Sequence, residues 1–554
     1  MKKYFYSFIF FFLLAISASK FVNGQEASLQ QLIKNISADS IRKHVELLGH
    51  DSLQGRGTGT RGERIAANYI ASHLEKHQFI PIGDQRSFFQ SIPMHGSFPL
   101  RESQLKIYNE AEEYQLALGK DYLLYKSGAQ TFIPQPVPLV FVGYGIIAPE
   151  FDYDDYQAMD VEGKVVVFLS GEPLSSDSLY FNGSDPTIYS YAESKQRLAI
   201  SRGAIGSILI PSSGDYQHWD WQRSVRDFAF EDITLAYSVA GNLAVLMNAE
   251  TAKILFETTP ILLDQVFEMD RAGALHSFDL STKLSFKGVF TEREFFASNI
   301  IGMFEGANRK PDDSYLIISA HYDHLGIGQP IAGDSIYNGV LDNAIGVAAS
   351  MEIARAFTML PQKPLHSIIF LFLTGEEKGL LGSTYYLDHP IVPLYKTIAN
   401  LNIDGLAVND QFNDVVGIGA ELSTLGDYLK KVAGLLNLKV SPIPSQFAAT
   451  ESFARSDQVA FARAGIPSIL ISEGLNYKNM TQEEALQKTI EWFENVYHTP
   501  FDDLNQPINY EAVRQHCQVL FAFCYSLANS TVLPQWKPGT PFINERLRTI
   551  AEKR

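Results

Sequence analysis

The chain has 554 residues, of which 46% are hydrophobic and 19% are charged, and its formal net charge at pH 7 is -17. This length exceeds what one hydrophobic core ordinarily organises, so we expect a globular protein of two or more domains. The acidic balance argues against a protein that binds nucleic acid through a basic face, and we interpret it as ordinary acidic solubility.

Residues 1–24 have the pattern of a secretory signal peptide. Lys2 and Lys3 precede an almost unbroken apolar run at residues 4–16, and small residues follow up to Gly24. The run is short for a membrane span, so we favour a signal peptide over an anchor. No other long apolar stretch occurs in the sequence, and we therefore expect an exported protein, periplasmic or extracellular, without stable membrane insertion.

The first half of the chain predicts helices followed by a small α/β unit. We expect a helix at 27–48, a Gly-rich loop at 51–62, a helix at 63–77, alternating strands within 87–125, further strands at 137–144, 163–169 and 203–210, and a helix at 194–202. The glycines at 57, 59 and 62 imitate a dinucleotide-binding fingerprint. Because no strand precedes them, we reject that interpretation. The small α/β unit ends near residue 285.

From residue 299 onward, apolar strands alternate with helical patterns. The expected strands are 299–304, 315–320, 367–373, 398–403 and 466–471, and the expected helices are 346–357, 380–387 and 506–527. This alternation predicts an α/β fold with a mixed, mostly parallel sheet and helices on both faces. Cys517 and Cys524 lie two turns apart in the last helix, too far for an easy disulfide, and we expect both to be core cysteines.

Acidic and imidazole side chains recur at strand ends and in Gly-marked turns: His321, Asp342, Glu376, Glu377, Asp404 and His498. Each of them alone is most simply a solvated loop residue, but open α/β proteins build their sites at the carboxyl edge of the sheet. The adjacent carboxylates Glu376 and Glu377 at the mouth of a buried strand repel each other and need cations.

Two histidines and three carboxylates, with one carboxylate bridging, would hold two divalent metals. The mixed nitrogen and oxygen set suits zinc, although manganese or cobalt would also fit. Such a pair would activate a water and polarise a carbonyl, and a carboxylate left off the metals would act as general base.

Residues 299–505 resemble a zinc aminopeptidase of the M28 peptidase family. The resemblance rests on SAHYDH at 319–324, GVLDN at 339–343, TGEE at 374–377, NID at 402–404 and YHTP at 497–500. GRGTG at 55–59 resembles the family's amino-terminal start. GYGIIA at 143–148 and RGAIG at 202–206 resemble the protease-associated domain often inserted there.

The resemblance implies a zinc-dependent exopeptidase fold with a smaller inserted protease-associated domain. Together with the signal peptide at 1–24, we therefore expect an amino-terminal part of the peptidase domain at 25–130, the inserted domain at 131–285, the peptidase domain at 286–530 and a tail at 531–554.

The resemblance also implies two Zn2+ per chain. One metal would be held by His321, Asp342 and Asp404. The other would be held by Asp342, Glu377 and His498, so that Asp342 bridges the two.

Further roles follow from the same resemblance. Glu376 would be the general base, and Asp323 would accept a hydrogen bond from His321 and fix its tautomer. Asp502 would orient His498, and the peptide bond after Asp342 would be cis.

The sequence departs from the family pattern at Gln458, where many relatives carry histidine after Ser-Asp. No metal ligand is lost, but the departure puts the substrate-side shape around Asp457 in doubt. Asp457 is either a rim residue or a substrate contact.

The leading functional prediction is an exported aminopeptidase acting on peptide substrates. A carboxypeptidase or an N-acyl amino-acid hydrolase would use the same metals, and would differ in having a basic cluster that binds a carboxylate in place of an anion that binds an ammonium. Arg455 and residues 472–474 are candidates for either role. A peptidase-like binding protein without catalysis is disfavoured, because all five ligands and the base are present. No motif indicates an oligomeric state.

Overall fold

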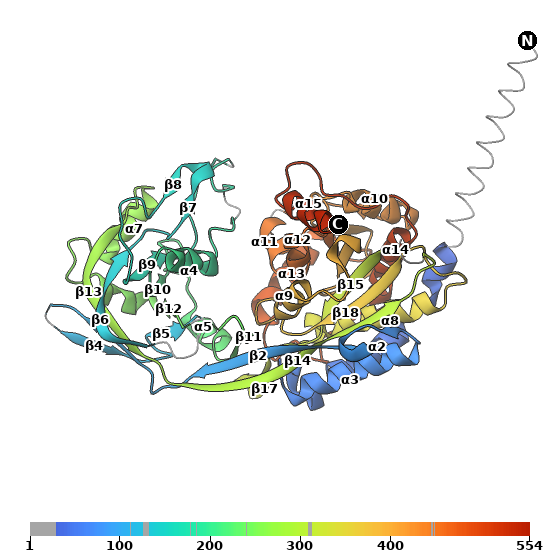
Figure 1. Ribbon diagram of the computed structural model, residues 1–554, viewed down its shortest axis with the longest axis horizontal. Coiled ribbons are helices and arrows are strands. Elements are labelled where there is room, and N and C mark those ends of the chain that lie inside the picture. Colours follow the sequence, from blue (N-terminus) through green and yellow to red (C-terminus); the bar gives the residue numbers. More distant parts are fainter. Residues whose placement is uncertain are drawn as a thin grey trace, which may run out of the picture.

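A computed structural model describes residues 29–110, 112–125, 132–177, 179–183, 186–239, 241–308, 313–444, 447 and 449–553. The predicted signal peptide at 1–24 lies outside these residues. Within the described part of the chain, no helix combines the length and the apolar character that crossing a bilayer requires. Figure 1 shows two lobes, with long strands running from the larger lobe toward the smaller.

The larger lobe is built on a ten-stranded mixed sheet. Its strands are β1 (Ile80–Pro81), β2 (Phe89–Pro99), β11 (Asp232–Leu235), β14 (Phe290–Phe304), β15 (Tyr315–His321), β18 (Ser367–Leu373), β19 (Thr397–Asn402), β20 (Asp414–Ile418), β21 (Lys439–Val440) and β22 (Ser468–Glu473). The order is β11-β2-β14-β18-β15-β19-β22-β20-β21, with β1 paired to β14. The four strands β18, β15, β19 and β22 run parallel at its centre. The predicted α/β fold with a mixed sheet is therefore confirmed.

Helices cover both faces of this sheet. Side chains of β15 alternate between the faces: Leu316 and Ile318 join one apolar cluster, and Ile317 joins another. The first cluster includes residues of α2 (Ala38–Leu48), α3 (Arg61–Lys76), α8 (Ile345–Thr358), α10 (Leu425–Leu435) and α14 (Tyr510–Ala528). The second includes residues of α9 (Leu381–Asp388) and α12 (Gln458–Arg463). Burial on both faces explains why the central strands are continuous apolar runs.

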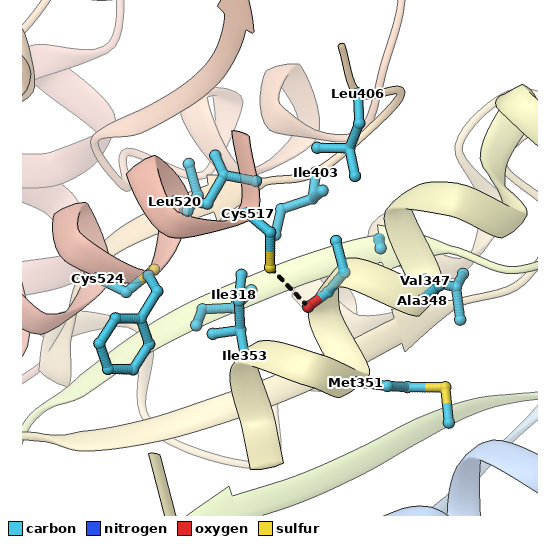
Figure 2. Close-up of a cluster of buried hydrophobic side chains, with 14 of the residues drawn as sticks. Ile318, Val347, Ala348, Met351, Ile353, Ile403, Leu406, Cys517, Leu520 and Cys524 are labelled. Atoms are coloured by element: carbon cyan, nitrogen blue, oxygen red, sulfur yellow. Dashed lines mark hydrogen bonds between the residues drawn. The ribbon is translucent and has the colours of Figure 1, made fainter. Parts of the chain in front are cut away.

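The two cysteines lie in the first of these clusters. Both are free and buried on α14. Figure 2 shows Cys517 among aliphatic side chains that include Ile318 and Ile353, where its Sγ donates to the main-chain oxygen of Ala349 at 3.7 Å. The prediction that Cys517 and Cys524 are core residues is confirmed.

The smaller lobe is built on an eight-stranded sheet. Its strands are β3 (Gln104–Tyr108), β4 (Glu113–Leu116), β5 (Tyr122–Leu124), β6 (Phe132–Phe141), β9 (Val165–Leu169), β10 (Gly206–Ile210), β12 (Leu243–Met247) and β13 (Phe278–Lys287), in the order β4-β3-β13-β6-β9-β10-β12-β5. The strands β6, β9, β10 and β12 run parallel. The helices α4 (Ala192–Ser201), α5 (Trp221–Asp227), α6 (Ala249–Ala252) and α7 (Leu263–Arg271) belong to the same stretch of chain.

The two sheets do not divide at the predicted domain boundary. The strands of the small sheet begin at Gln104, ahead of residue 131, because β3 and β4 pair beside β13. Conversely, β11 lies within 131–285 but pairs with β2 at the edge of the large sheet. The inserted stretch therefore contributes a strand to the larger lobe. The division into domains stays a prediction.

Candidate metal centre

The predicted site residues come from elements that meet at the carboxyl edge of the central strands. His321 is the last residue of β15, Glu376 and Glu377 follow β18, and Asp404 follows β19. The strands β18 and β19 flank β15 on either side and run parallel to it, so their ends share one edge. Two further ligand candidates come from connecting segments: Asp342, in the helical turn Val340–Ala344 before α8, and His498, three residues after α13 (Gln482–Asn495).

The carboxylate of Asp342 lies between the two histidines. Its Oδ1 is 3.2 Å from Nε2 of His321, and its Oδ2 is 3.3 Å from Nε2 of His498. Each imidazole also faces a second carboxylate, because Asp404 Oδ1 lies 3.2 Å from His321 Nε2 and Glu377 Oε2 lies 3.1 Å from His498 Nε2. The five predicted ligands thus form two sets that share Asp342.

The protonation of His321 is set by its own chain. Its Nδ1 lies 3.2 Å from the main-chain oxygen of Asp323, and a carbonyl can only accept, so Nδ1 carries the proton. The lone pair of Nε2 then faces Asp342 and Asp404, which is the arrangement of a metal-binding imidazole. Without a cation at this position, Nε2 would have to carry the second proton of the imidazole ring.

The electrostatics of the site agree with this need for positive charge. Burial alone would lower the pKa of His321, but the facing carboxylates, above all Asp404, raise it well above its ordinary value. In the same way Glu377 and Asp342 overcome burial and raise the pKa of His498 to about 10. Ligand atoms of His321, Asp342 and Glu377 all lie within 4.8 Å of one another. The residues present therefore fit a bound divalent metal.

Asp323 takes part in a different way from the one expected. Its carboxylate Oδ1 is 3.9 Å from Nδ1 of His321, too far for a hydrogen bond. The carboxylate accepts instead from Oγ1 of Thr58 at 3.0 Å and from the main-chain N–H of Glu376 at 3.1 Å. Asp323 therefore fixes His321 through its main chain and Glu376 through its side chain, because the turn after β15 directs the carbonyl back to the imidazole.

Asp502 also differs from expectation. Its carboxylate accepts the main-chain N–H groups of Leu341 at 2.8 Å and Asp342 at 3.0 Å, and it makes no hydrogen bond to His498 in the described structure. The peptide bond between Asp342 and Asn343 is cis, as the resemblance implied.

Three residues that support the site were missed as individual residues, although each lies inside a motif. His324 is buried, and its Nδ1 lies 2.6 Å from Oε1 of Glu377. The ring of Tyr497 stacks on that of His498, with a centroid separation of 3.8 Å. Arg56, in the Gly-rich loop, is 1% exposed and donates to main-chain oxygens of four residues: Leu48, Tyr322, Asn338 and Gly339.

Gln458, which stands where many relatives carry histidine, makes no hydrogen bond to the proposed metal ligands in the described structure. Gln458 is buried, accepts from Asn402 at 2.9 Å and donates to the main-chain oxygen of Phe453 at 2.9 Å. Asp457 is fully buried rather than at the rim, and Oγ of Ser383 donates to its Oδ1 at 2.5 Å. Burial raises the pKa of Asp457 to about 7. The residue therefore lies beneath the site.

The fold and this constellation define a candidate divalent-metal centre at the carboxyl edge of an α/β sheet. Residues 299–524 match the model of peptidase family M28. This part of the chain thus matches the family that the sequence motifs indicated.

Individual proteins are similar to parts of the chain. The chain is 28% identical over 285 residues to leupeptin-inactivating enzyme 1 of Streptomyces exfoliatus, which covers 50% of this chain and 59% of that protein. It is 32% identical over 124 residues to a probable zinc metalloprotease of Pyricularia oryzae, which covers 22% of each chain. The match thus spans little more than half of the first relative and less of the second.

A solved structure shares the fold. The aminopeptidase from Aneurinibacillus sp. strain AM-1 superimposes with a TM-score of 0.54 at 20% sequence identity, over 90% of this chain and 95% of that one. At this identity, the likeness concerns the fold alone.

Proposed function

We propose that the chain is an exported aminopeptidase that uses two zinc ions to release amino-terminal residues from peptides. The observation that carries this proposal is the position of Asp342, whose two carboxylate oxygens face two different histidines, each with a further carboxylate beside it. A carboxylate with one oxygen toward each of two imidazoles is suited to bridging two ions. Export rests on the sequence of residues 1–24.

The ligand sets follow from these distances. His321, Asp342 and Asp404 would hold one ion, and Asp342, Glu377 and His498 the other. Nitrogen and carboxylate donors without a thiolate suit zinc, and the name of the Pyricularia oryzae relative mentions the same metal. When bound, the ions would supply Lewis-acid polarisation of the scissile carbonyl and a water of lowered pKa.

Glu376 is the group that this site leaves for proton transfer. Its main-chain N–H is held by Asp323, and its side chain is only partly buried. Burial and the neighbouring carboxylates, above all Glu377, raise the pKa of Glu376 well above its ordinary value, although His321 opposes them. A carboxylate with this tendency takes a proton from the attacking water and delivers it to the leaving nitrogen.

The charges around the site favour a substrate with a free ammonium. Three further carboxyl groups are buried beside the proposed metal ligands: those of Asp323, Asp457 and Asp502. The nearby guanidinium of Arg56 is occupied by main-chain oxygens, and Arg455 is exposed. Because two bound zinc ions would offset the ligand carboxylates, the ionised side chains beside them, such as Asp323, are the groups that would favour the amino end of a peptide over its carboxylate end.

Hydrolysis of paired peptides tests this function. The two peptides are identical except that one has a free and the other an acetylated amino terminus, and each is assayed with and without a metal chelator. The proposal expects release of the amino-terminal residue from the free peptide only, and loss of this activity with chelator. Cleavage of the acetylated peptide, or release from the carboxyl end, would contradict it and favour an acyl hydrolase or a carboxypeptidase.

A further inference from the structure

The stretch 131–285, predicted as the inserted domain, pairs with the large sheet through β11. Its register pairs Asp232 with Ser97 and Leu235 with Met94, so β11 forms the edge of the large sheet. Beyond β11, the hydroxyl of Tyr237 donates to Asp388 at 3.0 Å. The residues directly before β11 are therefore held in a fixed place beside the peptidase lobe.

Phe230 occupies that place and contacts two segments of the peptidase lobe. Its ring lies edge-on to the ring of Tyr337, with centroids 5.0 Å apart and planes at 89°. It also covers the backbone at Gly328, where an added Cβ would lie 2.6 Å from the ring. On the other side, Nζ of Lys378 lies 5.4 Å from the centroid of the Phe230 ring, which is within the range of a cation–π contact.

These contacts join segments that carry the proposed metal ligands. Lys378 follows Glu377 directly, and its ammonium interacts electrostatically with that carboxylate. Tyr337 ends the hairpin strand β17 (Asp334–Tyr337), five residues before Asp342. Phe230 thus lies where the two segments can be held at a fixed separation.

The neighbouring Glu231 holds a third segment. Its carboxylate accepts from Nε of Arg293 at 2.7 Å and from Nη2 at 2.6 Å. The same guanidinium donates to the main-chain oxygens of Thr58 and Gly59, both at 3.4 Å. Because the hydroxyl of Thr58 donates to Asp323, this chain of contacts ends at the residue that holds Glu376.

We propose that Phe230 is a positioning residue of the metal centre: through Tyr337 and Lys378, it fixes the segments that carry Asp342 and Glu377. The stretch 131–285 then contributes to metal binding and catalysis indirectly, by holding segments that carry the proposed ligands. Contacts behind a ligand typically change metal affinity or activity by about 10–100-fold when removed. This inference rests on the proposed metal centre, but its deciding readout, the zinc affinity, does not depend on the substrate.

The test compares Phe230→Ala with Phe228→Ala in the full chain. Phe228 is a matched control, because it is an aromatic residue of the same segment whose ring packs on Tyr125 at 5.6 Å, inside the small lobe. Zinc affinity is measured by competition with a chelator, and kcat and KM with an amino-acid 4-nitroanilide. We expect Phe230→Ala to weaken zinc binding and lower kcat by about 10-fold or more with little change in KM, and Phe230→Leu to restore part of both.

A double-mutant cycle with Lys378→Met tests the route of the effect. The proposal predicts that Phe230→Ala costs clearly less zinc affinity in the Lys378→Met background than in the wild type, because the contact is already lost. Zinc affinity within twofold of wild type in Phe230→Ala, or equal losses in Phe230→Ala and Phe228→Ala, would overturn it. If Phe230→Ala fails to fold, the Lys378→Met variant alone decides. Normal zinc affinity in that variant would overturn the proposal, because the contact between Phe230 and Lys378 would then be dispensable. Normal zinc affinities with no hydrolysis by the wild type would count against the proposed function separately.

Discussion

The carboxylate of Asp502 holds the main chain of Asp342 in place. Oδ2 of Asp502 accepts the N–H of Asp342 at 3.0 Å, and Oδ1 accepts the preceding N–H at 2.8 Å. Asp502 is fully buried, so water does not compete for these bonds. The orientation of the shared carboxylate between the two histidines therefore depends on a residue 160 positions away in the chain.

Asp502→Asn should weaken zinc binding by about 10-fold, because the amide keeps one acceptor oxygen but turns an NH2 group toward the second main-chain N–H. The measurement is a zinc competition titration on the purified variant. Asp503→Asn is the matched control, since the carboxylate of Asp503 accepts from Asn505 alone among the described residues, at 2.9 and 2.6 Å. Equal zinc affinity in the two variants would argue against this role of Asp502.

Asp342→Ala should abolish the binding of both metals while the chain still folds. Asp342 is the one residue whose oxygens face both histidines among the described residues. Zinc content by elemental analysis after dialysis measures the loss, and circular dichroism verifies the fold. Retention of one tightly bound zinc would mean that the two ligand sets do not share this carboxylate.

Glu376→Ala should retain zinc and fold but lose about 10²–10⁴-fold in kcat, because the proposed general base is removed while all five proposed ligands remain. Steady-state kinetics and zinc content measured on the same preparation separate the two effects. Near-normal turnover in this variant would show that another group takes the proton.

Arg56→Lys should destabilise the fold around the site. The buried guanidinium donates to four main-chain oxygens, and a single ammonium cannot reproduce this fork, so at least one carbonyl stays unpaired. We expect a loss of about 3 kcal/mol in the free energy of unfolding. Chemical denaturation measures it, with Arg64→Lys as control, because the guanidinium of Arg64 makes a single long hydrogen bond in the described structure, of 3.5 Å to Gly59. A loss of stability equal to that of Arg64→Lys would contradict this stabilising role of the Arg56 guanidinium.

Acid should destabilise the chain through a buried histidine cluster on α2 and α3. Burial lowers the pKa of His44 to about 4 and that of His73 to about 3, and their ring centroids lie 5.0 Å apart. The folded state therefore binds fewer protons than the unfolded state below pH 6.5. The stability that these histidines support is fully present above that pH and is lost as the pH falls toward 4, by about 1.4 kcal/mol per pH unit for each histidine.

Denaturation of the metal-free protein between pH 4 and pH 7 tests this slope. His73→Gln should flatten the dependence, while His50→Gln, at an exposed position, should leave it unchanged. A variant His73→Gln with the wild-type slope would place the acid sensitivity elsewhere.

The parallel core of the fold was predictable because each central strand is a continuous apolar run. β18 spans the predicted residues 367–373, and β15 extends the predicted strand by one residue, to His321. The pairing of β2 with β14 was not predictable from the sequence. Its register joins Phe89 to Ile300, and no local pattern encodes a contact across that distance in the chain. The predicted helix at 27–48 is interrupted before α2, where Ser37 caps the helix by accepting the N–H of Ser40.

The candidate site likewise has features that the sequence predicts and features that it does not. Ligand candidates such as His321 and Asp404 could be recognised because parallel strand ends necessarily meet at one edge. The partners of Asp323 and Asp502 could not, because they depend on the direction of individual main-chain N–H and C=O groups. Phe230 gave no sequence signal, since its importance arises only from where β11 joins the large sheet.

The number of zinc ions bound per chain is the most direct test of a dinuclear centre. Metal-depleted wild-type protein is titrated with zinc, and the bound equivalents are determined together with the recovery of peptide hydrolysis. Because Asp342 offers one oxygen to each histidine, we expect two equivalents, with full activity only when both are bound. Saturation at one equivalent with full activity would contradict a shared, dinuclear centre.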